Sequence, residues 1–169
     1  MPSRTVLITG CSSGIGHDAA HTLSARGFDV VASARGEADV ESLRAEGLEA
    51  LPLDLADSTS IGEAVEALRT RTSDRLYGLF NNGAFGLPAA VEDLDRDALR
   101  AQFEANLFGW VELTNRCLPI MRRQGFGRIV QNSSVLGFSV LPFRGAYCAT
   151  KYALEALSDA LRLELAGTR

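Results

Sequence analysis

A tyrosine and a lysine stand four residues apart in the segment AYCATKYAL, residues 146–154. The surrounding residues have helical period, so Tyr147 and Lys151 are expected to lie one turn apart on the same face. A free phenol, with a pKa of about 10, is a poor base at neutral pH. A neighbouring ammonium lowers that pKa, so the pair predicts a tyrosine that exchanges protons with a substrate. The alternative is an ordinary polar pair on a helix.

A serine precedes this pair at the end of a strand-like run. Ser134 lies thirteen residues before Tyr147 in RIVQNSS. The carboxyl edge of an open α/β sheet is where such sheets bind ligands, so a hydroxyl there can anchor a substrate oxygen. Neighbours on a strand point to opposite sides, so only one of Ser133 and Ser134 is expected to face the site.

Strand-like runs and helical stretches alternate along the whole chain. The strand-like runs are TVLIT (5–9), DVVASA (29–34), LEALPLD (48–54), LYGLFNN (76–82) and GRIVQNSS (127–134). The helical stretches are 14–26, 37–46, 58–72, 95–124 and 145–166. The runs are almost continuously apolar, as in a parallel sheet covered by helices on both faces. We therefore predict one α/β domain over residues 1–169, a doubly wound parallel sheet of five strands.

Glycines at the first strand-to-helix junction predict a nucleotide site. TGCSSGIG places Gly10, Gly14 and Gly16 where the backbone must turn tightly and approach a pyrophosphate at the N-terminus of a helix. Ser12 and Ser13 can add hydroxyl contacts. Glycines in this pattern also occur in ordinary turns, but their place between a strand and a helix favours a dinucleotide.

The second strand predicts which dinucleotide binds. Sites selective for NAD usually place an acid at its end, but here Ala34 is followed by Arg35, a planar cation suited to a 2′-phosphate. NADP is therefore favoured over NAD, although Arg35 can also be a solvated loop charge that Glu37 offsets. After the third strand, Asp54 is placed to accept from the adenine amino group, whereas Asp57 or Ser58 suits the start of the next helix.

Five ordered motifs together resemble the short-chain dehydrogenase/reductase family: TGCSSGIG, NNGA at 81–84, NLFG at 106–109, SSVLG and YCATK. The resemblance covers essentially the whole chain and implies a Rossmann fold and NAD(P)-dependent oxidation of an alcohol or reduction of a ketone. It implies four catalytic residues: Tyr147 as general acid or base, Lys151 lowering its pKa and binding the nicotinamide ribose, Ser134 holding the substrate oxygen, and Asn106 maintaining a water-linked proton path. The cofactor contacts that it implies are Gly10, Ser12, Ser13, Gly14, Ile15, Gly16, Asp54, Leu55 and Asn81.

Two departures from the family pattern bear on these expectations. NNGA replaces the usual N-N-A-G, so Asn82 and Gly83 carry less weight than Asn81. The chain stops soon after the helix at 145–166, where members continue with further strands and a substrate-covering loop. We expect a C-terminally truncated form whose fifth strand is an exposed edge. A stripe of alanines from Ala146 to Ala160 lets another helix approach closely, and members of the family commonly pair this helix across subunits. Both features predict a homodimer or homotetramer.

Composition excludes several other functions. The net charge is −4 and the 17 Lys and Arg are scattered, so no nucleic-acid or membrane-surface partner is indicated. No apolar run is long enough to span a membrane, and three widely spaced cysteines favour a cytoplasmic protein. His17 and His21 lie one turn apart, but no third ligand is placed beside them, so no metal is expected.

The expected substrate is a small secondary alcohol or ketone. Phe138, Val140, Leu141 and Phe143 follow Ser134 and can form an apolar substrate wall or pack the fold. Cys148 lacks a partner histidine and is expected to be a small buried side chain. A non-catalytic module that senses NADP(H) is the alternative function.

Overall fold

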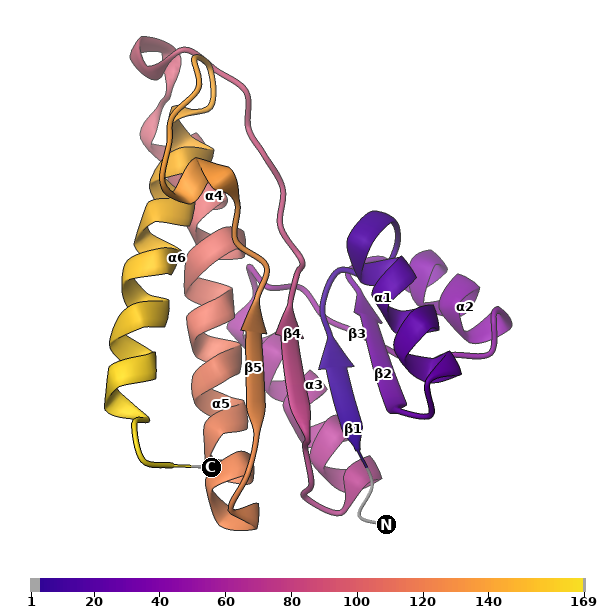
Figure 1. The fold of residues 1–169 in the computed structure, drawn as a ribbon. Coiled ribbons are helices and arrows are strands. Elements are labelled where there is room, and N and C mark those ends of the chain that lie inside the picture. Colours follow the sequence, from indigo (N-terminus) through magenta and orange to yellow (C-terminus); the bar gives the residue numbers. More distant parts are fainter. Residues whose placement is uncertain (1–3, 169) are drawn as a thin grey trace.

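A five-stranded parallel sheet forms the centre of the molecule (Figure 1). The computed structural model describes residues 4–168. The strands are β1 (Thr5–Ile8), β2 (Asp29–Ala34), β3 (Glu49–Pro52), β4 (Gly78–Asn81) and β5 (Arg128–Gln131), in the order β3-β2-β1-β4-β5. The chain adds strands on one side of β1 and then crosses to the other, so the carboxyl ends of β1 and β4 form a topological switch point. The predicted fold is confirmed.

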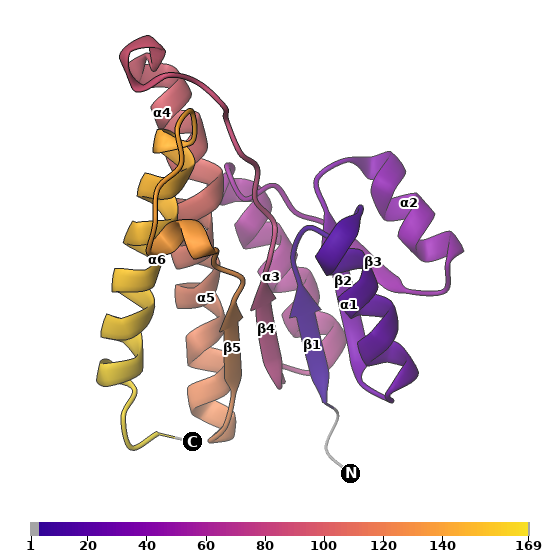
Figure 2. The ribbon, with the colours of Figure 1, turned by 45° about the horizontal axis from the view of Figure 1, so that its top comes forward.

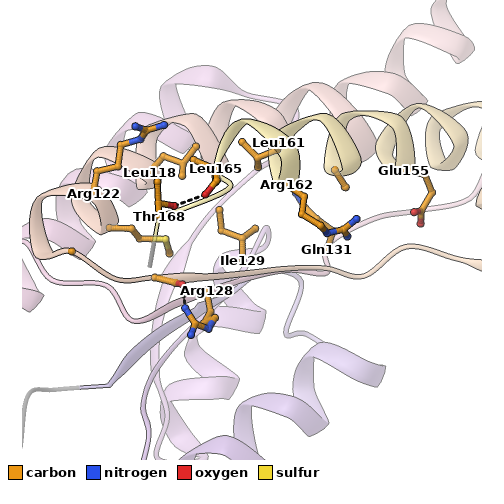
Figure 3. Close-up of a pocket in the computed structure, with 14 residues that line it drawn as sticks. Leu118, Arg122, Arg128, Ile129, Gln131, Glu155, Leu161, Arg162, Leu165 and Thr168 are labelled. Atoms are coloured by element: carbon orange, nitrogen blue, oxygen red, sulfur yellow. Dashed lines mark hydrogen bonds between the residues drawn. The ribbon is translucent and has the colours of Figure 1, made fainter.

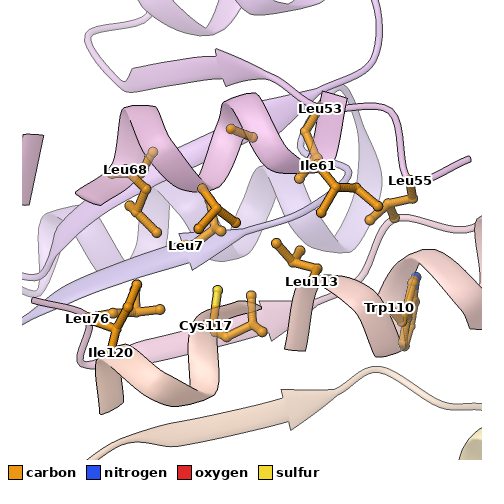
Figure 4. Close-up of a cluster of buried hydrophobic side chains, with 14 of the residues drawn as sticks. Leu7, Leu53, Leu55, Ile61, Leu68, Leu76, Trp110, Leu113, Cys117 and Ile120 are labelled. Carbon is orange, nitrogen blue, oxygen red and sulfur yellow. The ribbon is translucent and has the colours of Figure 1, made fainter. Parts of the chain in front are cut away.

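Helices cover both faces of this sheet. They are α1 (Gly14–Ala25), α2 (Glu37–Ala45), α3 (Ser58–Thr72), α4 (Arg96–Phe103), α5 (Gly109–Gln124) and α6 (Gly145–Glu164). Successive strand residues feed separate cores: Leu7 packs with α3, α5 and α6, whereas Val6 and Ile8 pack with α1 and α2. Figure 4 shows the first core, in which apolar side chains of α3, such as Ile61 and Leu68, face those of α5, such as Leu113 and Ile120.

The stretch 95–124 differs from the single helix that we predicted. It forms α4, then a π-helical turn over Glu104–Phe108, and then α5. A π turn widens the helix and is common at functional sites. Here it places Asn106 and Leu107 in the interior, where the Asn106 side chain bonds the backbone of Phe85.

Acidic caps define the starts of two helices. Asp57 accepts a hydrogen bond from the Thr59 amide at 2.8 Å, and Asp95 accepts one from the Ala98 amide at 2.7 Å. The assignment of the helix-capping acid to Asp57 or Ser58 is therefore confirmed, for Asp57. None of the helices formed by residues 4–168 is long and apolar enough to cross a bilayer.

One side of β5 has no neighbouring strand among the described residues. Beside it, an open pocket of about 730 Å³ lies between α5, α6 and β5, lined by apolar side chains such as Leu118, Ile129 and Leu161 and by polar ones such as Arg122 and Glu155 (Figure 3). Val130 is 55% exposed on this strand. The expected exposed edge is present, and the pocket includes none of the predicted site residues.

Candidate active site

The glycine loop lies at the switch point and is fastened to β4. The Thr9 hydroxyl accepts from the amides of Asn82 and Gly83 at 2.8 and 2.9 Å, while the Asn82 side chain donates to the carbonyls of Thr9 and Gly10. Gly10 has a φ of +69°, and a Cβ there would lie 2.5 Å from the Gly83 Cα. A side chain at position 10 is excluded twice, by the backbone conformation and by contact.

The N-terminus of α1 differs from those of α3 and α4. Within the described chain, Ser13 at its N-cap makes no side-chain capping bond, and no acid lies in the first turn. A Cβ at Gly16 would lie 2.3 Å from the Gly10 carbonyl oxygen, so this first turn packs directly on the loop. The exposed Ser13, Gly14 and Ile15 therefore leave amides and a positive helix end facing outward, which suits an anionic group.

The loop leads on one side into a pocket of about 210 Å³ at the ends of β1, β2 and β3. Five predicted cofactor residues line it: Gly10, Ser12, Arg35, Asp54 and Leu55. Arg35 is exposed, and the nearby Glu37 lies 3.9 Å from Arg44. Asp39 adds a negative charge to the same pocket. The Asp54 carboxylate accepts from the Ala56 amide at 2.9 Å, which holds it at the pocket.

On the other side lies a pocket of about 520 Å³ that contains the predicted reactive group. Ser134, Tyr147 and Lys151 all line it, together with Ile15 of the glycine loop. Ala84 and Phe85 line both pockets, so the two lie side by side at the carboxyl edge of the sheet, and together they are called the groove below. Tertiary structure thus unites the predicted phosphate loop with residues of β5 and α6.

Lys151 is the most constrained member of this group. It is 1% exposed and is the only lysine in the sequence. Its Nζ donates to the Asn132 carbonyl at 2.8 Å and lies 4.3 Å from the centroid of the Trp110 ring and 5.6 Å from that of Tyr147. Burial lowers the pKa of Lys151 from 10.5 to about 8, and the charge of Glu155 opposes part of that shift. An ammonium has three donors, so two remain for a ligand.

Ser134 retains a free donor in this pocket. Its Oγ accepts a hydrogen bond from the Leu136 amide at 3.1 Å, which fixes the oxygen and leaves the hydroxyl hydrogen to be donated. Ser133 also lines the pocket, although its Oγ is buried and has no partner among the described residues. Because the Ser133 hydroxyl oxygen is buried, the expectation that only one serine side chain faces the site stays a prediction, with Ser134 as that residue.

The geometry agrees with comparisons with known proteins. A family model described as short chain dehydrogenase matches residues 4–169. The chain belongs to the short-chain dehydrogenase family.

Named relatives of this chain are oxidoreductases. It is 47% identical over 162 residues to the "Uncharacterized oxidoreductase YbbO" of Escherichia coli strain K12, covering 96% of this chain and 60% of that protein. It is 37% identical over 172 residues to the mitochondrial D-beta-hydroxybutyrate dehydrogenase of Mus musculus, covering 96% and 50%. The chain thus spans about half to three fifths of the length of these curated relatives.

A solved short-chain dehydrogenase from Streptomyces avermitilis has the same fold. The TM-score is 0.93 at 35% identity, and the match covers 98% of this chain and 62% of that one. Fold and family therefore agree, and the chain is a member of an oxidoreductase family whose cofactor is NAD or NADP.

Two predicted site residues of this dehydrogenase lie away from the groove surface. Asn81 is buried, and its amide donates to Thr114 and Gln131 at 3.0 and 2.8 Å, which ties β4 to α5 and β5. Asn106 is buried in the π turn and forms two bonds with the backbone of Phe85, at 3.0 and 2.7 Å. Both side chains are buried and bond neighbouring segments of the groove. The contact of Asn81 with the cofactor and the part of Asn106 in a proton path therefore stay predictions.

Sequence reasoning missed three residues of the site. Asn132 accepts from Lys151 through its carbonyl and donates to the Asn82 side chain at 2.8 Å, so it connects α6 to the glycine loop. Trp110 packs against the ammonium and donates to the Gly83 carbonyl at 2.6 Å. Arg144 lines the pocket one turn before Tyr147. In the sequence, Asn132 is marked only by its position next to Ser133. Its contact with Lys151 is made by the backbone carbonyl, which every residue has, so its residue type could not have predicted the contact.

Proposed function

We propose that this dehydrogenase transfers a hydride between NADP(H) and a secondary alcohol or ketone, with Tyr147 as general acid or base. The observation that carries the proposal is the meeting of Tyr147, Ser134 and Lys151 on one pocket of the groove, beside the pocket that the glycine loop lines. In reduction, Ser134 donates to the substrate carbonyl and Tyr147 gives the proton to its oxygen. In oxidation, Tyr147 takes the alcohol proton.

The Lys151 ammonium assists this proton transfer. Its charge favours the phenolate of Tyr147, and its two remaining hydrogens suit ribose hydroxyls. The Asn132 carbonyl and the Trp110 ring hold the ammonium in position. We propose that Asn106, which fixes Phe85 in the groove, also supports a water-linked path by which the proton leaves.

NADP is the proposed cofactor, and it supplies or accepts the hydride. Its pyrophosphate suits the uncapped amides of α1, where Ser13, Gly14 and Gly16 lie. Arg35 suits the 2′-phosphate. Glu37, the acid that could offset its charge, lies 3.9 Å from Arg44, and this supports the role of Arg35. Asp54, Leu55 and Asn81 are proposed for the adenosine side.

The substrate is proposed to carry an apolar body. The segment between Ser134 and Arg144 presents Phe138, Val140, Leu141 and Phe143, which are 71%, 69%, 55% and 64% exposed. These side chains do not pack the core formed by residues 4–168, which argues against the packing alternative. They lie outside the pocket of Tyr147 itself, so the proposed wall borders that pocket in sequence through Ser134 and Arg144.

Further expectations about the whole protein stay proposals. We propose a cytoplasmic homodimer or homotetramer in which the outward face of α6 meets a second copy, because Ala149, Ala156 and Ala160 are exposed there. Light scattering tests this, and a monomer at micromolar concentration contradicts it. The expectation that further strands and a substrate loop complete the domain is supported by the edge position of β5.

Replacement of Tyr147 distinguishes a catalytic oxidoreductase from a non-catalytic module that senses NADP(H). Tyr147→Phe removes the acid and base, so NADPH-dependent ketone reduction should fall by about 10²–10⁴-fold while NADPH affinity is retained. Tyr152→Phe is the matched control on the same helix, because Tyr152 is 44% exposed and outside the pocket, and it should keep activity. Absence of turnover with any ketone or aldehyde despite tight NADPH binding would favour the sensing module.

A further inference from the structure

Two histidines of α1 and one glutamate after α2 converge outside the dinucleotide groove. The Nε2 atoms of His17 and His21 each lie 2.7 Å from the same oxygen, Oε2 of Glu46. The three ligand atoms lie within 4.8 Å of one another. Figure 2 shows α1 and α2 side by side at the end of the sheet away from α6. No third ligand for this histidine pair is apparent in the sequence, and the fold supplies one from 25 residues beyond His21.

The geometry points to a Zn²⁺ site formed by His17, His21 and Glu46. Two imidazole nitrogens and one carboxylate oxygen are a donor set that zinc takes, with the fourth position left to water. Both histidines present the same ring nitrogen toward one point, and the helix fixes their spacing.

The three side chains reach the geometry of a zinc site by rotation alone. In a tetrahedral zinc site with bonds of about 2.1 Å, ligand atoms lie roughly 3.4 Å apart. The present contacts of 2.7 Å are hydrogen bonds between the rings and the carboxylate. Binding a cation requires the carboxylate oxygen to move away from the rings by less than about 1 Å. It also requires the two Nε2 atoms, which lie within 4.8 Å of each other, to come closer by rotation of the histidine side chains.

A neighbouring hydroxyl orients the carboxylate. Ser42 donates to the other oxygen of Glu46, Oε1, at 3.3 Å. That bond leaves Oε2 directed at the two rings, as the outer partners of metal ligands do. The hydrogen bonds from His21 first, and then from His17, lower the pKa of Glu46, so the carboxylate is charged at neutral pH.

A bound zinc ion would join the first two turns of α1 to the end of α2. Both helices cover the core on the glycine-loop side of the sheet. The expected consequence is greater stability of that side, with a melting temperature that depends on the zinc concentration. This inference is independent of the proposed redox activity, because none of its residues lines the groove.

Calorimetric titration of the chelator-treated protein with ZnCl₂ tests the site. Wild type should bind one equivalent, and a hundredfold excess of Zn²⁺ over its Kd should raise Tm by roughly 5–10 °C. His21→Asn and Glu46→Gln should each weaken binding at least about tenfold. Asp18→Asn is the matched control, because it removes an exposed negative charge between the two histidines and should leave binding unchanged.

The outcomes separate a three-ligand site from its alternatives. Equal affinity in wild type and Glu46→Gln would overturn the proposal, because the histidine pair would then bind zinc alone. Binding that survives in the double variant His17→Asn/His21→Asn would show that the ion binds elsewhere. No binding to wild type would show that the three side chains form only a hydrogen-bonded contact between α1 and the end of α2. Either result overturns the proposal. Melting of each variant without zinc shows whether it is folded.

Discussion

The two halves of the dinucleotide groove are formed in different ways. On the side of β1, β2 and β3, backbone dominates: Gly10 lies against Gly83, Gly16 lies against Gly10, and the first amides of α1 are left open. On the side of β4 and β5, the site consists of side chains from separate elements, with Lys151 held between Asn132 and Trp110.

This difference implies different sensitivities to substitution. The backbone half fails when a side chain is added at Gly10 or Gly16, because no space exists for a Cβ at either position. A side-chain site fails when one functional group is removed, although its fold survives. The reactive half should therefore respond mainly in rate and pH dependence, and the glycine half in stability and cofactor affinity.

Removal of the ammonium should give the largest effect. Lys151→Met keeps an unbranched apolar side chain but leaves Tyr147 without a neighbouring cation, so ketone reduction and alcohol oxidation at pH 7 should fall about 100-fold or more. The rise of oxidation with pH should also move to higher pH. Initial rates from pH 6 to pH 10 provide the measurement. A wild-type pH profile in the variant would contradict the role assigned to Lys151.

Addition of one methyl group should disrupt the other half. A Cβ in Gly16→Ala would lie 2.3 Å from the Gly10 carbonyl oxygen and 2.5 Å from the Asn82 amide, so the free energy of unfolding should fall by about 1–3 kcal/mol. NADPH affinity should fall with it. Urea unfolding and fluorescence titration measure both quantities.

Gly62→Ala is the control for that substitution. Gly62 lies inside α3, where a Cβ would lie 3.6 Å from the Arg116 guanidinium, an ordinary contact. Alanine favours helix over glycine, so stability should stay the same or rise by up to about 1 kcal/mol. Equal losses in both variants would show that the close packing at Gly16 is not the cause.

Cofactor choice should respond to a single charge in the glycine half. Arg35→Ala removes the cation proposed for the 2′-phosphate, so NADPH affinity should fall about 10–100-fold while NADH affinity is unchanged. Arg26→Ala, at the C-cap of α1, serves as the control. Tighter binding of NADH than NADPH by wild type would reject the NADP assignment.

The smallest expected effect is the shifted pKa of Lys151. Because Lys151 is the only lysine, protein labelled with ¹³C at lysine Cε gives a single signal whose shift with pH reports this group directly. The midpoint should lie at about 8. A midpoint near 10.5, the ordinary pKa of lysine, would show that water reaches the ammonium and that the side chains around Lys151 pack less closely than in the structure.

The same shift predicts a pH dependence of stability. Between pH 8 and 10.5 the unfolded chain holds the Lys151 proton more than the folded chain does, so this group adds stability as pH rises through that window. The difference in unfolding free energy between wild type and Lys151→Met should therefore change in favour of wild type from pH 8 to pH 10. The buried thiols of Cys11 and Cys117, with pKa values raised to about 11 and 12, are common to both proteins and cancel.

Local patterns in the sequence determined most of the fold and the choice of the residues proposed to react. Apolar runs alternating with helical stretches predicted five parallel strands, and the observed order has them. Gly10 and Gly16 at the first junction, and Tyr147 and Lys151 on one helical face, depend on spacings of a few residues. Such spacings determine which side of a single helix or turn each residue faces, so they can be predicted from the sequence alone.

Convergence between distant segments was decided only by the tertiary structure. The Lys151 ammonium meets a backbone carbonyl and an indole ring from two other elements, and Glu46 meets His17 across 29 residues. The stretch 95–124 contains a π turn whose Asn106 side chain bonds the backbone of Phe85 in a neighbouring segment. Periodicity cannot encode these contacts, because they depend on how the helices pack on the sheet and therefore on the positions of all its strands together.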